Sequence, residues 1–184
     1  MAVARQAKLI FKNLGKLDEE EIEIIRSIRN EIGVRKNMYS HDEISRSEHL
    51  EWVARVCRSN DTHFYAVLMD GKVAGGASIS AIDVVHKRAS WAFYLSSSYQ
   101  GRGIGSVLEQ QFVDFLFDNF DIEKLNCEVI EFNGSVIKLH KRFGFIQEGV
   151  RRNHVLREGR SYDAVLLGIT RQEWNSRSCP HTEK

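Results

Sequence analysis

The sequence is poor in residues that stiffen or cross-link a chain. It has one proline and three cysteines, Cys57, Cys127 and Cys179, none of them in a CxxC pair. An odd number of widely spaced cysteines is typical of free thiols in a reducing compartment and argues against a disulfide framework or a thiolate metal site. We therefore expect a cytoplasmic protein without a structural metal.

Long hydrophobic runs and an excess of charge are also missing. The N-terminal MAVARQAKLIF has no apolar run of signal-peptide length, and no later segment is long enough to span a bilayer. Lysines and arginines number 26 against 25 acidic residues, a net charge of +1, so neither nucleic acid nor a membrane is an expected partner. With 184 residues, 42% of them hydrophobic, the chain can bury the core of one soluble domain.

The N-terminal third begins with a strand and two helices in our interpretation of the hydrophobic pattern. KLIFKNL has the character of a short strand, and LDEEEIEIIRSIRNE combines helical spacing with an acidic first turn. A second helix is predicted from about Glu43 to Cys57, capped by Ser40 or Asp42.

The rest of the chain alternates between strand and helix periods. Strands are predicted at THFYAVLMD, GKVAGGASISAI, RASWAFYLSS and LNCEVIE, helices over 103–120 and at SVIKLHKRF, and two strands near the end. The order β-α-α-β-β-β-α-β-α-β-β favours a three-layer α/β domain with a mixed seven-stranded sheet. This single domain is expected over residues 1–174, with a flexible tail over 175–184.

Three glycines, at positions 101, 103 and 105, stand directly before a helix in YQGRGIGSVLEQQF. Glycine permits conformations in which consecutive N–H groups converge, and the helix adds its unpaired first-turn donors. The pattern predicts a pyrophosphate cradle, with Arg102 adding charge, although a tight strand-to-helix turn would also explain it. Neither a Walker A loop nor a dinucleotide-binding fingerprint matches the spacing.

Two blocks of the sequence resemble the GCN5-related N-acetyltransferase family. Residues 100–105, QGRGIG, are similar to its Q/R-x-x-G-x-G/A signature, and residues 133–145, NGSVIKLHKRFGF, to its block N-x-x-A-x-x-L-Y-x-x-x-G-F. The resemblance implies the fold of that family and direct acetyl transfer from acetyl-CoA to an amine. The cofactor-binding residues that it implies are Phe93, Tyr94, Leu95, Gln100, Gly101, Arg102, Gly103, Ile104, Gly105, Ser106 and Asn133.

Two residues are the catalytic candidates. His140 stands where the family usually has the tyrosine that protonates the leaving thiolate, and an imidazole can supply that proton. The alternative is a partly exposed histidine between two lysines of a helix. Glu128 lies in the strand that the family places beside the acetyl group, where it can accept a proton from an ammonium substrate; pairing with an arginine is the alternative. Cys127 is expected to point away from Glu128, which leaves no cysteine for an acetyl-enzyme.

The first two helices and their loop line the acceptor side of the cleft in this family. The segment IRNEIGVRKNMYSHDEISRSEHLEWV resembles the branch that acetylates the 4-amino group of a UDP-linked aminodideoxy sugar in pseudaminic-acid biosynthesis. An arginine would then bind phosphate, and aromatic side chains would contact the base and the sugar. The substrate-binding candidates are Arg29, Asn30, Met38, Tyr39, His49, Trp52 and Ser80, with His86 in the following loop.

Other interpretations stay open. Trp52 can be part of helix packing, and Arg29 can pair with its acidic neighbours. Similar loops occur in the branch that acetylates ribosomal-protein N-termini, and a non-catalytic coenzyme-A-binding module would explain the replaced tyrosine. His41 and His49 lack the HExxH pattern of a metal site. Exposed strands near the C-terminus leave a homodimer open.

Overall fold

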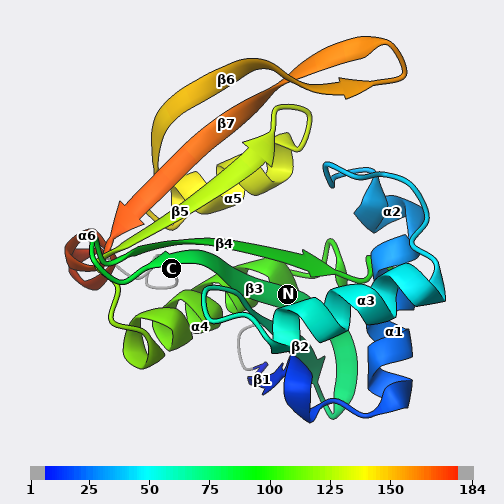
Figure 1. Cartoon of the computed structure of the whole chain (residues 1–184). Helices are drawn as coiled ribbons and strands as arrows, with labels where there is room; N and C mark the ends of the chain where they lie inside the picture. Colours follow the sequence, from blue (N-terminus) through cyan, green and yellow to red (C-terminus); the bar gives the residue numbers. More distant parts are fainter. Residues whose placement is uncertain (1–6, 178–184) are drawn as a thin grey trace.

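Seven strands form one mixed sheet in the computed structural model, which describes residues 7–177. The sheet order is β1-β2-β3-β4-β5-β7-β6, and every neighbouring pair is antiparallel except β4 and β5, which run parallel (Figure 1). The predicted mixed seven-stranded α/β sheet is confirmed. The strands are β1 Leu9–Asn13, β2 His63–Met69, β3 Lys72–Asp83, β4 Arg88–Leu95, β5 Lys124–Ile130, β6 Ile146–Arg157 and β7 Arg160–Thr170.

The helices differ from the sequence prediction at their ends and in number. The second predicted helix starts at Arg46, not near Glu43, because the Ser45 side chain and Glu48 form a reciprocal capping box. Neither Ser40 nor Asp42 is its cap. The short α2 and α6 were not predicted. The α-helices of the described residues are α1 Glu19–Asn30, α2 Ile32–Arg35, α3 Arg46–Cys57, α4 Ile104–Asn119, α5 Gly134–Arg142 and α6 Arg171–Ser176.

The expected tail over 175–184 begins inside α6, and residues 178–184 lie outside the described part of the chain. Within residues 7–177, no helix is both long and apolar enough to cross a membrane.

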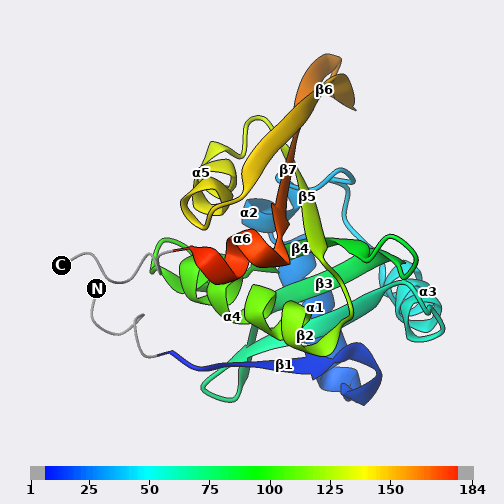
Figure 2. The same cartoon turned by 90° about the vertical axis from the view of Figure 1, so that its left-hand side faces the viewer.

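Helices cover both faces of the sheet (Figure 2). Strand alternation in β2 explains this, since Phe64 and Ala66 pack in one core cluster while Tyr65 and Val67 belong to the other. The smaller cluster includes Ile25 of α1 and Val56 of α3, and the larger contains the buried face of α4. The three-layer prediction therefore agrees with the packing.

The parallel strands β4 and β5 pair only over their first residues. Their ladder ends at Ser90↔Asn126, although β4 continues to Leu95 and β5 to Ile130. Beyond that pair the strands diverge, and β5, β7 and β6 rise away from the rest of the sheet (Figure 1). The diverging part of β4 has backbone groups that no β5 strand bond satisfies, so they are available to a ligand.

The β6–β7 hairpin reaches back across the opening toward α2. Its register shifts between Gln147 and Gly149 and between Arg151 and Val155, and such bulges bend a strand. Near its tip, the guanidinium of Arg157 donates hydrogen bonds to the carbonyl oxygens of Lys36 and Met38. The hairpin and the loop after α2 are thereby tied together over the opening.

Candidate active site

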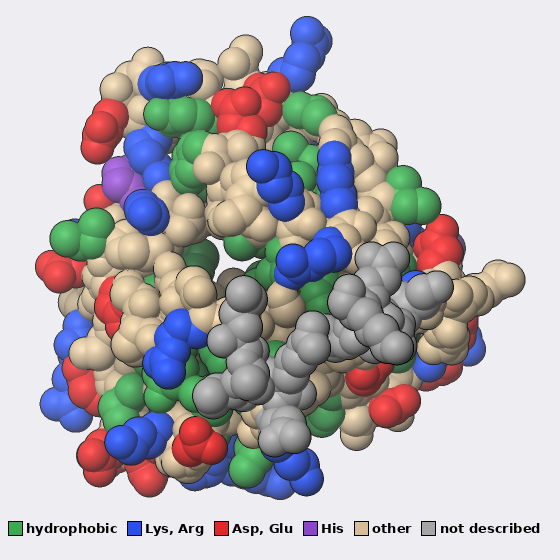
Figure 3. Space-filling model, turned by 180° about the vertical axis from the view of Figure 1, so that it is seen from behind, with side chains coloured by type: hydrophobic (Ala, Val, Ile, Leu, Met, Phe, Trp, Pro, Cys, Tyr) green, Lys and Arg blue, Asp and Glu red, His purple; other side chains and the backbone are tan. Residues whose placement is uncertain are grey.

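A pocket of about 550 Å³ occupies the divergence of β4 and β5. Its wall comes from five places in the chain: α2 and the following loop, β4, the glycine loop with the start of α4, β5, and α5. The face opposite to that of Figure 1 is hollowed near its centre, with lysine and arginine side chains near the hollow (Figure 3). The pocket therefore lies where the family resemblance expects acetyl-CoA.

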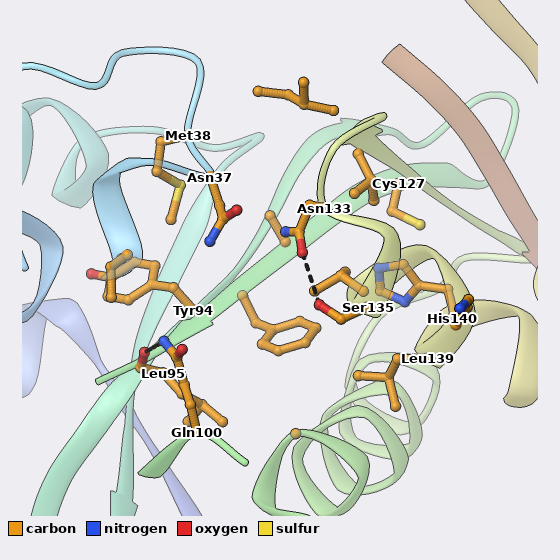
Figure 4. Close-up of a pocket in the computed structure, with 18 of the residues that line it drawn as sticks. Asn37, Met38, Tyr94, Leu95, Gln100, Cys127, Asn133, Ser135, Leu139 and His140 are labelled. Carbon is orange, nitrogen blue, oxygen red and sulfur yellow. Dashed lines mark hydrogen bonds between the residues drawn. The ribbon is translucent and has the colours of Figure 1, made fainter. Parts of the chain in front are cut away.

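The glycine loop has the backbone geometry that a cradle requires. Gly101 has φ 70° and Gly103, the N-cap of α4, has φ 79°, both in the left-handed region that favours glycine. The side chain of Gln100 donates to the carbonyl oxygen of Leu95 at 2.8 Å, which closes the loop onto the end of β4 (Figure 4). The first N–H groups of a helix have no acceptor one turn earlier, so the start of α4 can receive an anion, although the Ser106 N–H already donates to the Gly103 carbonyl oxygen.

Two cations beside this loop were missed as site residues. Lys138 and Arg142 line the pocket from α5, and Arg142 donates to the hydroxyl of Ser106. Their spacing of four residues on one helix face was the available signal. Arg102, which was expected to add charge, is exposed and donates to the carbonyl oxygen of Ser98 at 3.3 Å.

Glu31 was also missed by the sequence analysis. It precedes α2 and connects that helix to the residues that follow β4. Its carboxylate accepts from the Ser96 hydroxyl at 2.8 Å and the Ser97 amide at 2.6 Å. Although burial opposes the effect, these hydrogen bonds lower the pKa of Glu31. An ionised Glu31 thus holds α2 against the end of β4, and nothing in the local sequence pattern signals this contact.

The remaining predicted cofactor residues are placed together. Phe93, Tyr94 and Leu95 line the pocket along the diverging edge of β4. Asn133 lines it from the start of α5, and its side chain accepts from the Ser135 hydroxyl at 3.1 Å instead of capping the helix (Figure 4). Gly105 and Ser106 line it, while the Ile104 side chain is buried in the core beneath the cradle.

His140 lies on the pocket wall but is not the partly exposed helix residue that was the alternative. It is 3% exposed, and its ring packs edge-on to Trp91 and against Phe145. Its Nδ1 lies 2.9 Å from an oxygen of Glu109, a fully buried carboxyl group on α4. The sequence pattern gave no sign of this partner.

Glu128 lines the pocket and also forms an ion pair with an arginine, so both descriptions given by the sequence analysis apply. One oxygen accepts from Arg151 Nη1 at 2.7 Å. The other accepts from the Tyr39 hydroxyl and lies 3.4 Å from Nε2 of His154. Burial and the neighbouring Glu128 carboxylate raise the pKa of the Tyr39 phenol, which therefore stays a donor. Arg151 and His154 were missed because β6 is remote in sequence.

The predicted acceptor residues divide into two groups. Met38 and Tyr39 line the pocket. Arg29 and Asn30 support it: Arg29 donates to the carbonyl oxygen of Ser40 at 2.8 Å, and both ends of the Asn30 amide bond the backbone of Ile44 at 2.9 Å. Burial also lowers the pKa of the Arg29 guanidinium. These two side chains hold the loop that follows α2.

The other acceptor candidates do not line this pocket. His49 is buried and donates from Nε2 to the carbonyl oxygen of Ile22 at 3.1 Å, and Trp52 stacks on it and packs edge-on against Phe64. Ser80 pairs with Ser90 in the β3–β4 ladder, and His86 is exposed in the turn between these strands. The packing alternative for Trp52 agrees with the structure, because α3 turns this face toward the sheet.

Cys127 was expected to point away from Glu128 and to leave no cysteine near the acetyl group, but it lines the pocket. Because β5 diverges from β4, both faces of the strand border the space, and Cys127 lies at the same end as His140 (Figure 4). Burial, with Glu109 and Glu148 nearby, raises the pKa of its thiol well above the usual value. A neutral thiol is a poor nucleophile. Among residues 7–177, no cluster of His, Cys, Asp and Glu could hold a metal ion.

A glycine loop at a helix start, beside a parallel strand pair that opens, is the arrangement expected of a transferase that uses a coenzyme-A thioester. Residues 24–145 match the model of the acetyltransferase (GNAT) family, to which the chain belongs. It is therefore an N-acetyltransferase that uses acetyl-CoA, and not merely a coenzyme-A-binding module.

Three relatives show the range of the similarity. The SPbeta prophage-derived uncharacterized N-acetyltransferase YokL of Bacillus subtilis is 30% identical over 88% of this chain and 90% of its own length. The acetyltransferase PseH of Campylobacter jejuni is 23% identical over 73% of this chain and 83% of its own. A spermidine N-acetyltransferase of Vibrio cholerae, solved with CoA and spermine, superposes with a TM-score of 0.83 at 18% identity, over 94% and 99% of the chains. The last likeness concerns the fold alone.

Proposed function

We propose that the enzyme acetylates a primary amine on a small, negatively charged acceptor, specifically the 4-amino group of a UDP-linked aminodideoxy sugar. The observation that carries this proposal is the charge of the acceptor side. Glu128 is the one carboxylate among the described residues that line the pocket, and Arg151 already pairs with it. Arg157, whose guanidinium is held by the carbonyl oxygens of Lys36 and Met38, adds positive charge over the opening without a free N–H pair of its own.

This balance of charge disfavours a polycationic acceptor. A polyamine carries several ammonium groups, which the arginine side chains beside this pocket would repel. Binding it would require several carboxylates that are not already paired with arginine. A diphosphate finds the opposite environment, since arginine binds phosphate through paired N–H donors. The phosphate contact that the sequence assigned to Arg29 thus passes to the β6–β7 hairpin. The match to PseH is compatible with a sugar acceptor, and we extend it no further.

The chemistry follows from the positions of the polar groups. Attack by nitrogen on the acetyl carbonyl forms the N–C bond and breaks the C–S bond of the thioester. Glu128 accepts the proton that the ammonium group loses before attack and releases it to solvent. It then accepts the second proton, which the nitrogen loses after attack. Arg151 and Tyr39 hold the carboxylate in place. His140, which lines the pocket from α5, supplies the proton that the leaving thiolate takes up. Backbone N–H groups of the diverging β4 edge stabilise the oxyanion.

Thiol release from acetyl-CoA tests this function. The acceptors are the UDP-4-amino sugar, spermidine and a ribosomal N-terminal peptide, each titrated against the wild type, Arg151→Ala and Arg152→Ala. We expect rapid turnover of the sugar alone, with its KM raised about tenfold, or about 1.4 kcal/mol, in Arg151→Ala. The neighbouring exposed Arg152 is the matched control and should leave KM unchanged. Preferred turnover of spermidine or the peptide would refute the proposal.

A further inference from the structure

The buried pair of Glu109 and His140 lies between α4 and α5, with its histidine on the pocket wall. Nδ1 of His140 and Oε1 of Glu109 are 2.9 Å apart, and the carboxyl side chain has no exposed surface. The second oxygen, Oε2, is buried without a hydrogen-bond partner among the described residues. An unsatisfied buried carboxylate oxygen is costly, so this glutamate has a role that packing does not explain.

Aromatic rings enclose the imidazole, while the charges of Arg142 and Arg177 and the thiol of Cys127 act on the Glu109 carboxyl group. Trp91, Phe93 and Phe145 surround the imidazole ring, with centroids 5.3–6.1 Å from it. Burial raises the pKa of Glu109, while the hydrogen bond to His140 opposes this. Because Nδ1 faces Oε1 of Glu109, the geometry fits one proton shared between these two atoms, with the second proton of the pair on Nε2. Nε2 is then the ring nitrogen that can donate into the pocket.

We infer that Glu109 is a positioning residue that fixes the tautomer of His140 and passes it a proton during acetyl transfer. The inference rests on the acid role given to His140 above. The leaving thiolate takes the proton from Nε2, and Nδ1 takes or keeps the proton shared with Glu109. Glu109 ends as a carboxylate hydrogen-bonded to Nδ1–H. Solvent then returns one proton to the pair before the next turnover.

This arrangement explains why a histidine can replace the usual tyrosine. An isolated neutral imidazole can place its single hydrogen on either nitrogen, and only one of the two tautomers donates into the pocket. A carboxyl partner on Nδ1 removes that ambiguity. Glu109 touches no pocket surface of its own and acts entirely through the ring of His140.

The test combines kinetics with a spectroscopic measurement that needs no acceptor. Variants Glu109→Gln, His140→Asn and the double variant are compared with Asp118→Asn, an exposed carboxyl group on the same helix. We expect Glu109→Gln to lower kcat about 10- to 100-fold and to shift the pH profile of kcat, with the KM for acetyl-CoA within about twofold. The substitution should have no further effect in the His140→Asn background. Nitrogen NMR of the histidine rings should show a changed tautomer of His140 in Glu109→Gln, and Asp118→Asn should match the wild type.

The outcomes separate the two roles. An unchanged pH profile and tautomer in Glu109→Gln, beside an impaired His140→Asn, would refute the role of Glu109 and leave that of His140. Wild-type kcat in His140→Asn would refute the acid assignment and this inference together. A loss from Glu109→Gln that persists in the His140→Asn background would show that Glu109 acts on folding alone. Loss of coenzyme-A binding in Glu109→Gln would likewise show that Glu109 supports the fold and not the proton transfer.

Discussion

The guanidinium of Arg157 donates to the carbonyl oxygen of Met38 at 2.6 Å, across 119 positions of sequence. The same side chain stacks over Phe132 at 5.1 Å from the ring centroid. Through these contacts the β6–β7 hairpin holds the loop that carries Tyr39 over the acceptor side of the pocket. The part of the pocket to which we assign the acceptor thus depends on a contact between the N-terminal third of the chain and the C-terminal hairpin.

Replacing Arg157 by alanine should release that loop. We expect the KM for the acceptor to rise about tenfold, the equivalent of about 1.4 kcal/mol, with little change in coenzyme-A binding because the glycine cradle is elsewhere. Steady-state kinetics and calorimetric titration of coenzyme A measure the two effects. Arg160→Ala, which removes a guanidinium stacked on Tyr162 in the same hairpin, is the control. Equal effects of the two variants would contradict the role of the clamp.

Glu128→Gln should impair catalysis most where the acceptor amine is charged. A carboxamide cannot take up the ammonium proton, so we expect kcat/KM to fall about 100-fold near pH 7 and the defect to narrow toward about pH 9. Rates of thiol release over that range measure it. Glu131→Gln is the control and should leave the rate unchanged. Glu131 directly follows β5, and its carboxylate accepts a hydrogen bond from the Asp163 amide. A defect that is the same at every pH would mean that Glu128 does not remove the proton.

Gly103→Ala should weaken coenzyme-A binding beyond its effect on folding. An alanine at φ 79° is strained by roughly 1–2 kcal/mol. Relief of that strain would turn the backbone N–H groups at the start of α4 away from the anion. Gly159, at φ 75° in the β6–β7 turn with open space around it, has the same backbone constraint. Both alanine variants should lose similar free energy of unfolding in denaturant titration, while only Gly103→Ala should bind coenzyme A weakly. If the two variants bound coenzyme A equally well, the pyrophosphate would not bind at the glycine loop.

Trp52→Ala separates packing from base recognition. Because the indole is half-buried between His49 and Phe64, we expect a loss of roughly 2 kcal/mol in free energy of unfolding, less than for a fully buried tryptophan. The KM for a nucleotide-linked acceptor should be unchanged at a temperature where the variant is folded. A large rise in KM without loss of stability would restore the stacking role.

His49 should make the protein less stable in mild acid. Burial lowers the pKa of its imidazole from the usual 6.5, so the unfolded chain binds the proton more readily than the folded chain. The stabilisation by neutral His49 is therefore complete above about pH 6.5 and is lost as pH falls from there toward the lower folded pKa. His49→Gln should lack this dependence, and the difference in unfolding free energy from wild type should shrink between about pH 7 and about pH 5. A constant difference would contradict the shift.

Local pattern was sufficient for most of the fold. Alternation predicted the strands, since successive side chains of a strand face opposite layers, and the acidic first turn predicted α1. The start of α3 was misplaced because Ser40, Asp42 and Ser45 are all plausible caps, and only the bond from Ser45 to Glu48 distinguishes them. The four-residue α2 is too short to give a periodic signal.

The sequence by itself determined the glycine loop, the second block and thus the coenzyme side of the enzyme, because those residues act through contiguous backbone. Tertiary structure alone decided which side chains meet Glu128 and His140, the residues to which we assign the acceptor side and the acid. Glu128 meets Arg151, and His140 meets Glu109, only after strands and helices distant in sequence are packed together. It also decided that Trp52 and His49 turn inward. Residue type does not distinguish a polar or aromatic side chain in the core from one in a cleft. The packing of its neighbours determines which of the two positions it occupies.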